Sequence, residues 1–281
     1  MISRISLCVT LLAAFAFCSA ESELRDWSNA AGKTISAELV SLEGYSAILK
    51  MANGRTYTVP LADLSEADRE FVQEWKKEQE TAASLEEAGI ELGIPTKSIV
   101  ETAFDEETPR TRKGELLGWQ AGIGEWRIEE GVLIGDEVAE DNHASSLTYR
   151  FEADHLILTA EVQLGTAEQI AFACRDTVPP NLHLGRLYIT PDKLWIQRMS
   201  GIAKTTKSEK LVTRDVDLDP EKWYKVTIEI IGDRYRAKVG DEVIEATHER
   251  FQDAKGIVAL VNRGQGAKYR NVSLWQAKPK E

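Results

Sequence analysis

Short runs of alternating apolar and polar residues dominate the first part of the chain. Ile35, Ala37 and Leu39 alternate with polar neighbours, which is typical of a half-buried strand. Two further apolar runs flank Asn53-Gly54, a dipeptide that favours a tight hairpin because both residues tolerate positive φ. These patterns predict a small antiparallel meander.

A helical pattern follows the meander. Ser65 can cap a helix, and the apolar positions expected on its buried face are Ala67, Phe71, Val72 and Trp75. Residues 77–100 begin as a charged stretch of helix-forming residues and continue with Gly89, Gly93 and Pro95, which interrupt helices. We therefore expect residues 77–100 to form a charged, helical linker between two domains.

The remaining residues, 101–281, again carry strand patterns. Alternate apolar residues from Leu156 to Leu164 share one strand face, and Ile257–Val261 is a continuous apolar run, as in a central strand that is covered on both sides. Gly232-Asp233 and Gly240-Asp241 are turn signals. The predicted fold class is mainly β: a small barrel with a C-terminal helix, a helical linker, and a two-sheet sandwich.

Composition and charge narrow the class of protein. The 281 residues are 43% hydrophobic and 28% charged, the balance of a folded chain. With 34 basic and 46 acidic residues the formal net charge is −12, which argues against nucleic acid and against anionic membrane surfaces as partners. Beyond the N-terminus no apolar run is long enough for a transmembrane helix.

The N-terminus is predicted to direct export. Residues 1–20 contain Arg4, an apolar run, and the small residues Ser19 and Ala20, which is the pattern of a signal peptide cleaved near Ala20. We expect a secreted or periplasmic protein without a transmembrane segment in the mature chain. A membrane anchor formed by the same run, or a lipid on Cys18, remains an alternative.

Cleavage would remove Cys8 and Cys18 and leave Cys174 alone. A single cysteine forms no internal disulfide, and Cys174 lies in the strand-like run Ile170–Arg175. We therefore interpret Cys174 as a buried structural thiol and not as a nucleophile.

Residues 24–76 resemble a known family. The matching segments are Arg25-Asp-Trp27, Gly32-Lys33, Val40-Ser-Leu42, Asn53-Gly54-Arg55 and Val59–Asp68. They are similar to the Sla-homology domain of type one, an SH3-like barrel. The resemblance implies an SH3-like domain over residues 21–76 that binds peptides or partner proteins; eukaryotic members of the family bind short Asn-Pro-Phe peptides.

The second region resembles the 3-keto-disaccharide hydrolase domain family. The matching segments are Gly118-Trp119, Trp126–Gly135, Glu161-Val162, Ile170–Arg175, Trp223–Ile228, Gly232, Val239–Asp241, Gly256–Leu260, Gly264 and Tyr269–Val272. The resemblance implies a concanavalin A-like jelly roll over residues 101–281 and a carbohydrate as ligand or substrate. It also implies a possible hydrolase activity, the cleavage of 3-keto-glycosides.

Three residues are candidate catalytic groups: Glu161, Asp176 and His183. A keto group at C3 of a sugar acidifies the proton at C2, so a base could start an elimination. Glu161 is expected on the strand face opposite its apolar neighbours, and Asp176 at a strand end. The paired-carboxylate spacing of laminarinases, Glu-x-Asp-x-x-Glu, is absent.

Candidate substrate-binding residues lie nearby in the predicted sandwich. Trp195 could stack on a sugar ring, with Tyr188 beside it, although such an aromatic can equally fill the core. Side chains that could hold sugar hydroxyls are Arg175, Arg198, Asn262 and Arg263.

Metal and cofactor patterns are weak. Asp215, Asp217 and Asp219 resemble part of a calcium loop, but Pro220 and Val226 stand where an EF-hand needs Gly and Glu. The histidines show no zinc spacing, and there is no phosphate-binding glycine loop. We expect no metal site and no cofactor.

Two functional hypotheses follow. The first is an exported protein that binds or processes carbohydrate through its sandwich. The alternative is a noncatalytic adaptor whose small domain binds peptides or partner proteins. Convergence of Glu161, Asp176 and His183 in one groove would favour catalysis.

Overall fold

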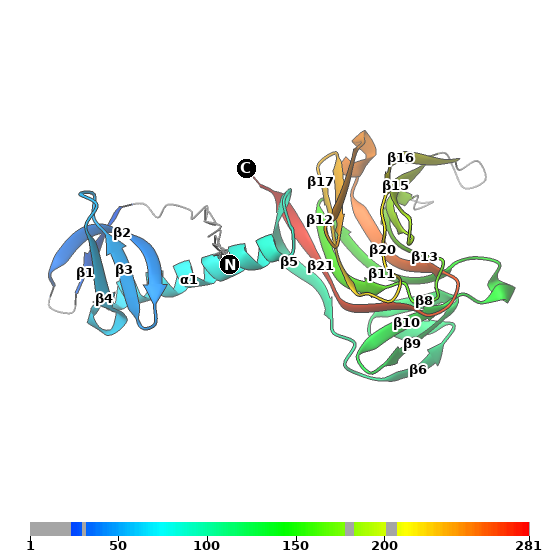
Figure 1. Ribbon diagram of the computed structural model, residues 1–281, viewed down its shortest axis with the longest axis horizontal. Helices are drawn as coiled ribbons and strands as arrows, with labels where there is room; N and C mark the ends of the chain where they lie inside the picture. Colours follow the sequence, from blue (N-terminus) through cyan, green and yellow to red (C-terminus); the bar gives the residue numbers. More distant parts are fainter. Residues whose placement is uncertain (1–23, 30–31, 178–182, 201–206, 281) are drawn as a thin grey trace, which may run out of the picture. The chain divides into compact units, whose positions relative to one another are not determined.

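The computed structural model describes residues 24–29, 32–177, 183–200 and 207–280 (Figure 1). The chain divides into two compact units at Ala82/Ala83, which we call the small unit and the large unit. The predicted signal peptide, residues 1–20, lies outside the described residues. Among the described helices, none combines the length and apolar character that a bilayer crossing requires.

The small unit contains the predicted meander. Its described strands form a four-stranded antiparallel sheet in the order β1 (Arg25–Ser28), β2 (Thr34–Glu43), β3 (Ser46–Lys50) and β4 (Thr56–Pro60). The turn at Asn53-Gly54 joins β3 to β4, and Gly54 has a φ of +80°, which explains the glycine. A short 3-10 turn, Leu61–Asp63, leads into helix α1 (Glu66–Glu87).

Helix α1 begins after Ser65 as predicted, but its buried face differs by one residue. Ala67 is exposed, and Asp68 is buried instead. The Asp68 carboxylate accepts hydrogen bonds from Arg25 (2.7 Å), the backbone N–H of Ser28 (2.8 Å) and the Ser65 hydroxyl (2.7 Å). Because these donors satisfy the carboxylate, the charged Asp68 is buried beside Ala67, the position at which the sequence predicts an apolar contact.

The large unit is the predicted two-sheet jelly-roll sandwich, and the chain as a whole is mainly β. One described antiparallel sheet has nine strands: β19 (Glu242–Thr247), β18 (Arg234–Val239), β17 (Tyr224–Ile231), β12 (Leu156–Gln163), β21 (Ala267–Pro279), β10 (Val132–Asp136), β9 (Glu125–Glu129) and β6 (Thr108–Thr111), with β5 (Gly93–Thr102) also paired to β21. The other has eight: β16 (Lys207–Asp215), β15 (Lys193–Ser200), β14 (His183–Ile189), β13 (Gln169–Asp176), β20 (Lys255–Arg263), β11 (Ser145–Ala153), β8 (Trp119–Ile123) and β7 (Gly114–Leu116).

One hydrophobic core lies between these two sheets. The alternate residues of β12 from Leu156 to Val162 contribute to it, as predicted. Every residue of Ile257–Val261 in β20 is buried, which confirms a strand covered on both sides. Cys174 is 3% exposed within this core, in agreement with a structural thiol.

The predicted linker, residues 77–100, is not a separate segment. Its first part continues α1 to Glu87, and its last part is the start of β5 in the nine-stranded sheet. Between them the backbone crosses the outward side of β17, where Glu229 is fully buried. The Glu229 carboxylate accepts the N–H groups of three consecutive residues, Glu91, Leu92 and Gly93, at 3.0, 2.7 and 3.0 Å. This buried acid fastens the crossing segment to the sandwich.

Candidate functional site

The outward side of the eight-stranded sheet gathers aromatic and cationic side chains. Along β13, Phe172 and Cys174 lie in the core, so Ala171, Ala173 and Arg175 point outward. The same alternation orients the neighbouring strands. We call this surface the arginine face, and its residues are Arg150, Ala171, Ala173, Arg175, His183, Arg186, Tyr188, Trp195, Gln197 and Ala259.

Two stacked rings form the aromatic part of the arginine face. Tyr188 on β14 and Trp195 on β15 are paired residues, and their rings stack at 4.5 Å with an interplanar angle of 9°. Both pack over a floor of outward-facing alanines. The ammonium group of Lys210 lies 4.5 Å from the centre of the Trp195 ring. A sugar can therefore stack on Trp195 in the expected way only where the exposed Lys210 side chain moves aside.

Arg186 lies beside this aromatic pair. Its guanidinium donates to the Tyr188 hydroxyl at 2.7 Å and to Nε2 of His183 at 2.8 Å. Its Nε–H is buried and has no hydrogen-bond partner among the described residues. A buried donor without an acceptor is uncommon and costs free energy, which a ligand that reached this N–H would recover.

Arg175 is the second cation of the face. In the register of β13 and β14, Arg175 lies opposite His183. The Nε–H of Arg175 is also buried and has no hydrogen-bond partner in the described part of the chain. Burial lowers the pKa of Arg175, and the positive charges of Arg186 and Arg150 lower it further. The guanidinium nevertheless stays charged at physiological pH, because an arginine pKa starts above 12. The arginine face is thus a region of concentrated positive charge.

His183 belongs to the same face, but its chemistry differs from the expected role of a base. Burial lowers the pKa of His183 to about 2, and Arg186, Arg175 and His143 add to the effect. The ring is therefore neutral at pH 7 and accepts from Arg186. A group with so low a pKa removes protons poorly. His183 positions Arg186 and is a weak candidate for a general base.

The other two expected catalytic residues lie elsewhere, so the three do not converge. Glu161 projects from the outward side of the opposite sheet and accepts from Arg270 (2.6 and 2.9 Å) and Asn271 (2.8 Å). Partial burial raises the pKa of Glu161, but hydrogen bonds from Asn271 and Arg270 outweigh this effect, so the pKa lies below its ordinary value. Asp176 is 6% exposed and forms an ion pair with Arg250 at 2.7 Å.

Of the expected substrate-binding residues, Arg175 and Trp195 lie on the arginine face, and the others have protein partners. Asn262 is fully buried, accepts from the Ser145 hydroxyl at 2.6 Å and donates to the carbonyl oxygens of Gly135 and Gly264 at 3.0 and 3.2 Å. Its amide therefore holds a loop and not a ligand. Arg198 forms an ion pair with Glu209 at 2.6 Å, and Arg263 with Glu137 at 3.6 Å.

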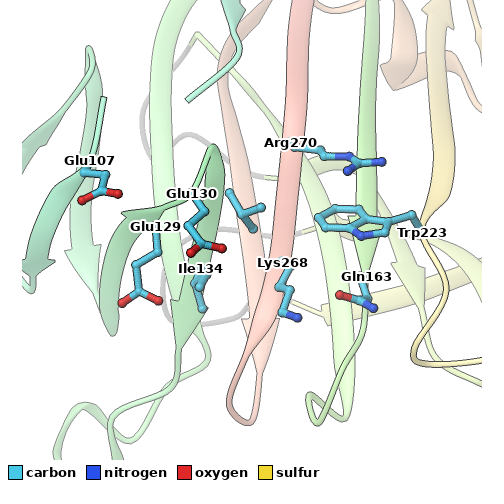
Figure 2. A pocket seen from close by; sticks show the side chains of 9 residues that line it. Glu107, Glu129, Glu130, Ile134, Gln163, Trp223, Lys268 and Arg270 are labelled. Atoms are coloured by element: carbon cyan, nitrogen blue, oxygen red, sulfur yellow. The ribbon is translucent and has the colours of Figure 1, made fainter. Parts of the chain in front are cut away.

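A separate groove of about 660 Å³ lies on the outward side of the nine-stranded sheet. Figure 2 shows Trp223 and Arg270 on one side of it and three glutamates on the other. The Arg270 guanidinium covers the Trp223 ring at 4.2 Å, and Glu161 holds Arg270 there. The complete lining is Glu107, Glu129, Glu130, Val132, Ile134, Gln163, Trp223, Lys268 and Arg270. The face of its Trp223 ring is covered by Arg270, and Arg270 and Glu129 form ion pairs within the protein.

No group of three or more His, Cys, Asp or Glu side chains in the described residues could hold a metal ion. The acidic run near Asp215 serves a turn instead: the Asp219 carboxylate accepts the N–H of Glu221. Arg186 is the functional candidate that sequence reasoning missed. The sequence shows only that Arg186 and Tyr188 are two residues apart and so share a strand face; their positions opposite Ala173 and Ala171 come from the structure.

Comparison with known proteins gives no family. No family model and no curated protein matches the chain. Among solved structures, carbohydrate-binding module CBM66 from Bacillus subtilis is similar, with 15% identity over 57% of this chain and 96% of that one, and a TM-score of 0.48.

Two other similar structures are the CBM2 module of the evolved Dit of Lactobacillus casei BL23 phage J-1 and the laminarinase from Rhodothermus marinus. The first has 13% identity, covers 68% of this chain and 100% of that one, and has a TM-score of 0.47. The second has 11% identity, covers 66% of this chain and 99% of that one, and also has a TM-score of 0.47.

Proposed function

We propose that the large unit recognises carbohydrate on its arginine face and does so without catalysis. The observation that carries the proposal is the combination, on one sheet face, of a stacked aromatic pair with buried N–H donors that lack acceptors. Sugar rings offer apolar C–H faces and many hydroxyl acceptors, which suit this combination. The resemblance to the 3-keto-disaccharide hydrolase domain family favours the same ligand class.

Catalysis needs a base near the substrate, and the arginine face supplies none of the expected strength. The pKa of His183 is about 2, which leaves the ring with little affinity for a proton at neutral pH. Glu161 lies on the opposite sheet and is occupied by Arg270 and Asn271. We therefore place binding ahead of 3-keto-glycoside cleavage.

The test is a glycan panel followed by calorimetric titration of the full chain with each saccharide that binds. Trp195→Ala and Gln197→Ala, both on the arginine face, should each weaken binding about tenfold, the loss expected for about 1.4 kcal/mol of contact. The matched control is Lys268→Ala in the groove of Figure 2, which should leave affinity unchanged. The opposite pattern would assign recognition to that groove, and turnover of a 3-keto disaccharide would refute binding without catalysis.

Peptide binding by the small unit is a second candidate function. Among the described residues, four of the five large hydrophobic side chains that stand exposed lie in this unit: Leu24, Val40, Tyr45 and Tyr57. Tyr45 is 89% exposed, which is more than solubility favours and suits an interaction surface. An array of Asn-Pro-Phe peptides, probed with the full chain and with Tyr57→Ser, tests this function; equal signals from both proteins would argue against it.

Export remains part of the proposal. N-terminal sequencing of the mature protein should give a start near Glu21, since small residues precede that position. Retention of Met1 in exported protein would contradict a cleaved signal peptide.

A further inference from the structure

The arginine face lacks the acidic partners that arginines have elsewhere in this chain. The formal net charge is −12, so carboxylates are abundant. In the described residues, the other partly or fully buried arginines each form an ion pair with a carboxylate: Arg25 with Asp68, Arg127 with Asp136, Arg198 with Glu209, Arg236 with Glu229, Arg250 with Asp176 and Arg270 with Glu161. Within the same residues, Arg175 and Arg186 form none.

The two unpaired arginines are also close neighbours. Arg186 lies opposite Ala173, one outward position from Arg175, and His183 contacts Arg186 while pairing with Arg175. Arg150 adds a third positive charge. In the sheet register, Ile257 on β20 lies between Arg150 on β11 and Arg175 on β13. Like charges at such positions repel each other, and burial strengthens the repulsion because the surroundings have a low dielectric constant.

The buried Nε–H groups of Arg175 and Arg186 lack acceptors in addition. A planar guanidinium offers a fork of N–H groups that matches the oxygens of an anion, and such charge-assisted bonds are the strong ones. An anionic group would satisfy the donors and offset the repulsion together. A neutral hydroxyl would satisfy a donor but leave the charges uncompensated.

We propose that the carbohydrate recognised by the arginine face is acidic, with an anionic group bound between Arg175 and Arg186. This inference rests on the proposed function and specifies its ligand class. Carboxylate sugars and sulfate esters share the required chemistry, a small oxyanion attached to a sugar ring. The partly exposed Trp195 ring, which stacks on Tyr188, would contact the sugar ring itself.

The experiment is calorimetric titration of the full chain with four probes: tetragalacturonic acid, its methyl ester, a sulfated carrageenan tetrasaccharide and cellotetraose. We expect at least one acidic probe to bind about tenfold or more tightly than the neutral probes, since hydrogen bonds between charged groups are stronger than neutral ones. Added NaCl should weaken the binding of that probe. The stronger acidic probe identifies carboxylate or sulfate as the source.

Substitutions locate the anion. Arg175→Gln and Arg186→Gln, which each remove one positive charge, should each remove most of the preference for the acidic probe, and using two variants guards against one that fails to fold. The matched control is Arg214→Gln, because Arg214 is an exposed arginine of the same sheet that is paired with Glu242. The ratio of the affinities for the acidic and the neutral probes should be the same in Arg214→Gln as in the unmodified protein.

The outcomes are distinct. Equal affinity for acidic and neutral probes, with loss in Trp195→Ala, overturns the acidic ligand and leaves carbohydrate recognition intact. No binding to any probe or to the glycan panel refutes both proposals. Inorganic sulfate that binds as tightly as the acidic saccharide would show an anion site without sugar recognition, which also overturns the inference.

Discussion

The buried carboxylate of Glu229 offers a sharp test of what holds the crossing segment to the sandwich. In Glu229→Gln, the side chain keeps its shape but one oxygen becomes an NH₂ group. The retained oxygen can still accept from Leu92 and Gly93. The new NH₂ group would face the N–H of Glu91 and the guanidinium of Arg236, which are both donors.

The expected loss follows from the contacts. Two hydrogen bonds to a charged acceptor disappear, and breaking one partner of a buried ion pair costs about 3–5 kcal/mol. The carboxylate of Glu91 also contacts Arg236, at 2.6 Å, and keeps that guanidinium partly neutralised. We therefore expect about 3 kcal/mol, near the lower end. For a unit of this size that lowers the melting temperature by about 6–12 °C.

Differential scanning calorimetry of the full chain is the appropriate assay, because each unit can give its own transition. Only the transition of the large unit should move. The control is Glu245→Gln on the same sheet, whose ion pair with Arg234 is exposed at 33% and 48% and should contribute about 1 kcal/mol or less. If Glu229→Gln shifts the transition no further than this control, the hydrogen bonds of Glu229 to residues 91–93 do not stabilise the large unit.

Three further predictions concern the large unit. His183 should stay neutral in NMR titrations down to about pH 4. Because the pKa of His183 in the folded protein lies below the unfolded value near 6.5, the free energy of unfolding should fall by up to about 1.4 kcal/mol per pH unit below pH 6.5. The variant His183→Gln should show a smaller slope. Burial raises the pKa of Cys174 to about 12, so iodoacetamide followed by mass spectrometry should modify it only after unfolding, and reductant should not change the melting temperature. A fragment that starts at Ala83 should give a cooperative unfolding transition. A fragment that starts at Thr108 should not, because the shorter fragment lacks β5 and the backbone N–H groups that bind Glu229.

Local patterns in the sequence were sufficient to predict several of the strands and turns. The alternation of Leu156 to Val162 predicts a strand with one buried face, and Asn53-Gly54 predicts a hairpin; both are present. The continuous apolar run Ile257–Val261 predicts a central strand, and β20 is one. These inferences succeed because side-chain direction in a strand depends only on the period of two along the chain.

The functional site could be predicted only in part for the same reason. Periodicity correctly turns Glu161 away from the core but does not say to which sheet its strand belongs. Glu161 and His183 therefore lie on opposite outer surfaces, although both alternate as expected. Sequence also favoured Asn262 as a donor for sugar hydroxyls, whereas tertiary contacts with Gly135 and Gly264 occupy its amide.

What only the tertiary structure decided is which charges are compensated. Asp68 and Glu229 are buried although both are charged, since donors distant in the chain surround them. Arg175 and Arg186 show the converse. Their neighbours along the chain are unremarkable, and strand pairing alone brings the two guanidinium groups together. Electrostatic energy depends on distance through space, so a lack of acidic partners becomes visible only when the sheet is assembled.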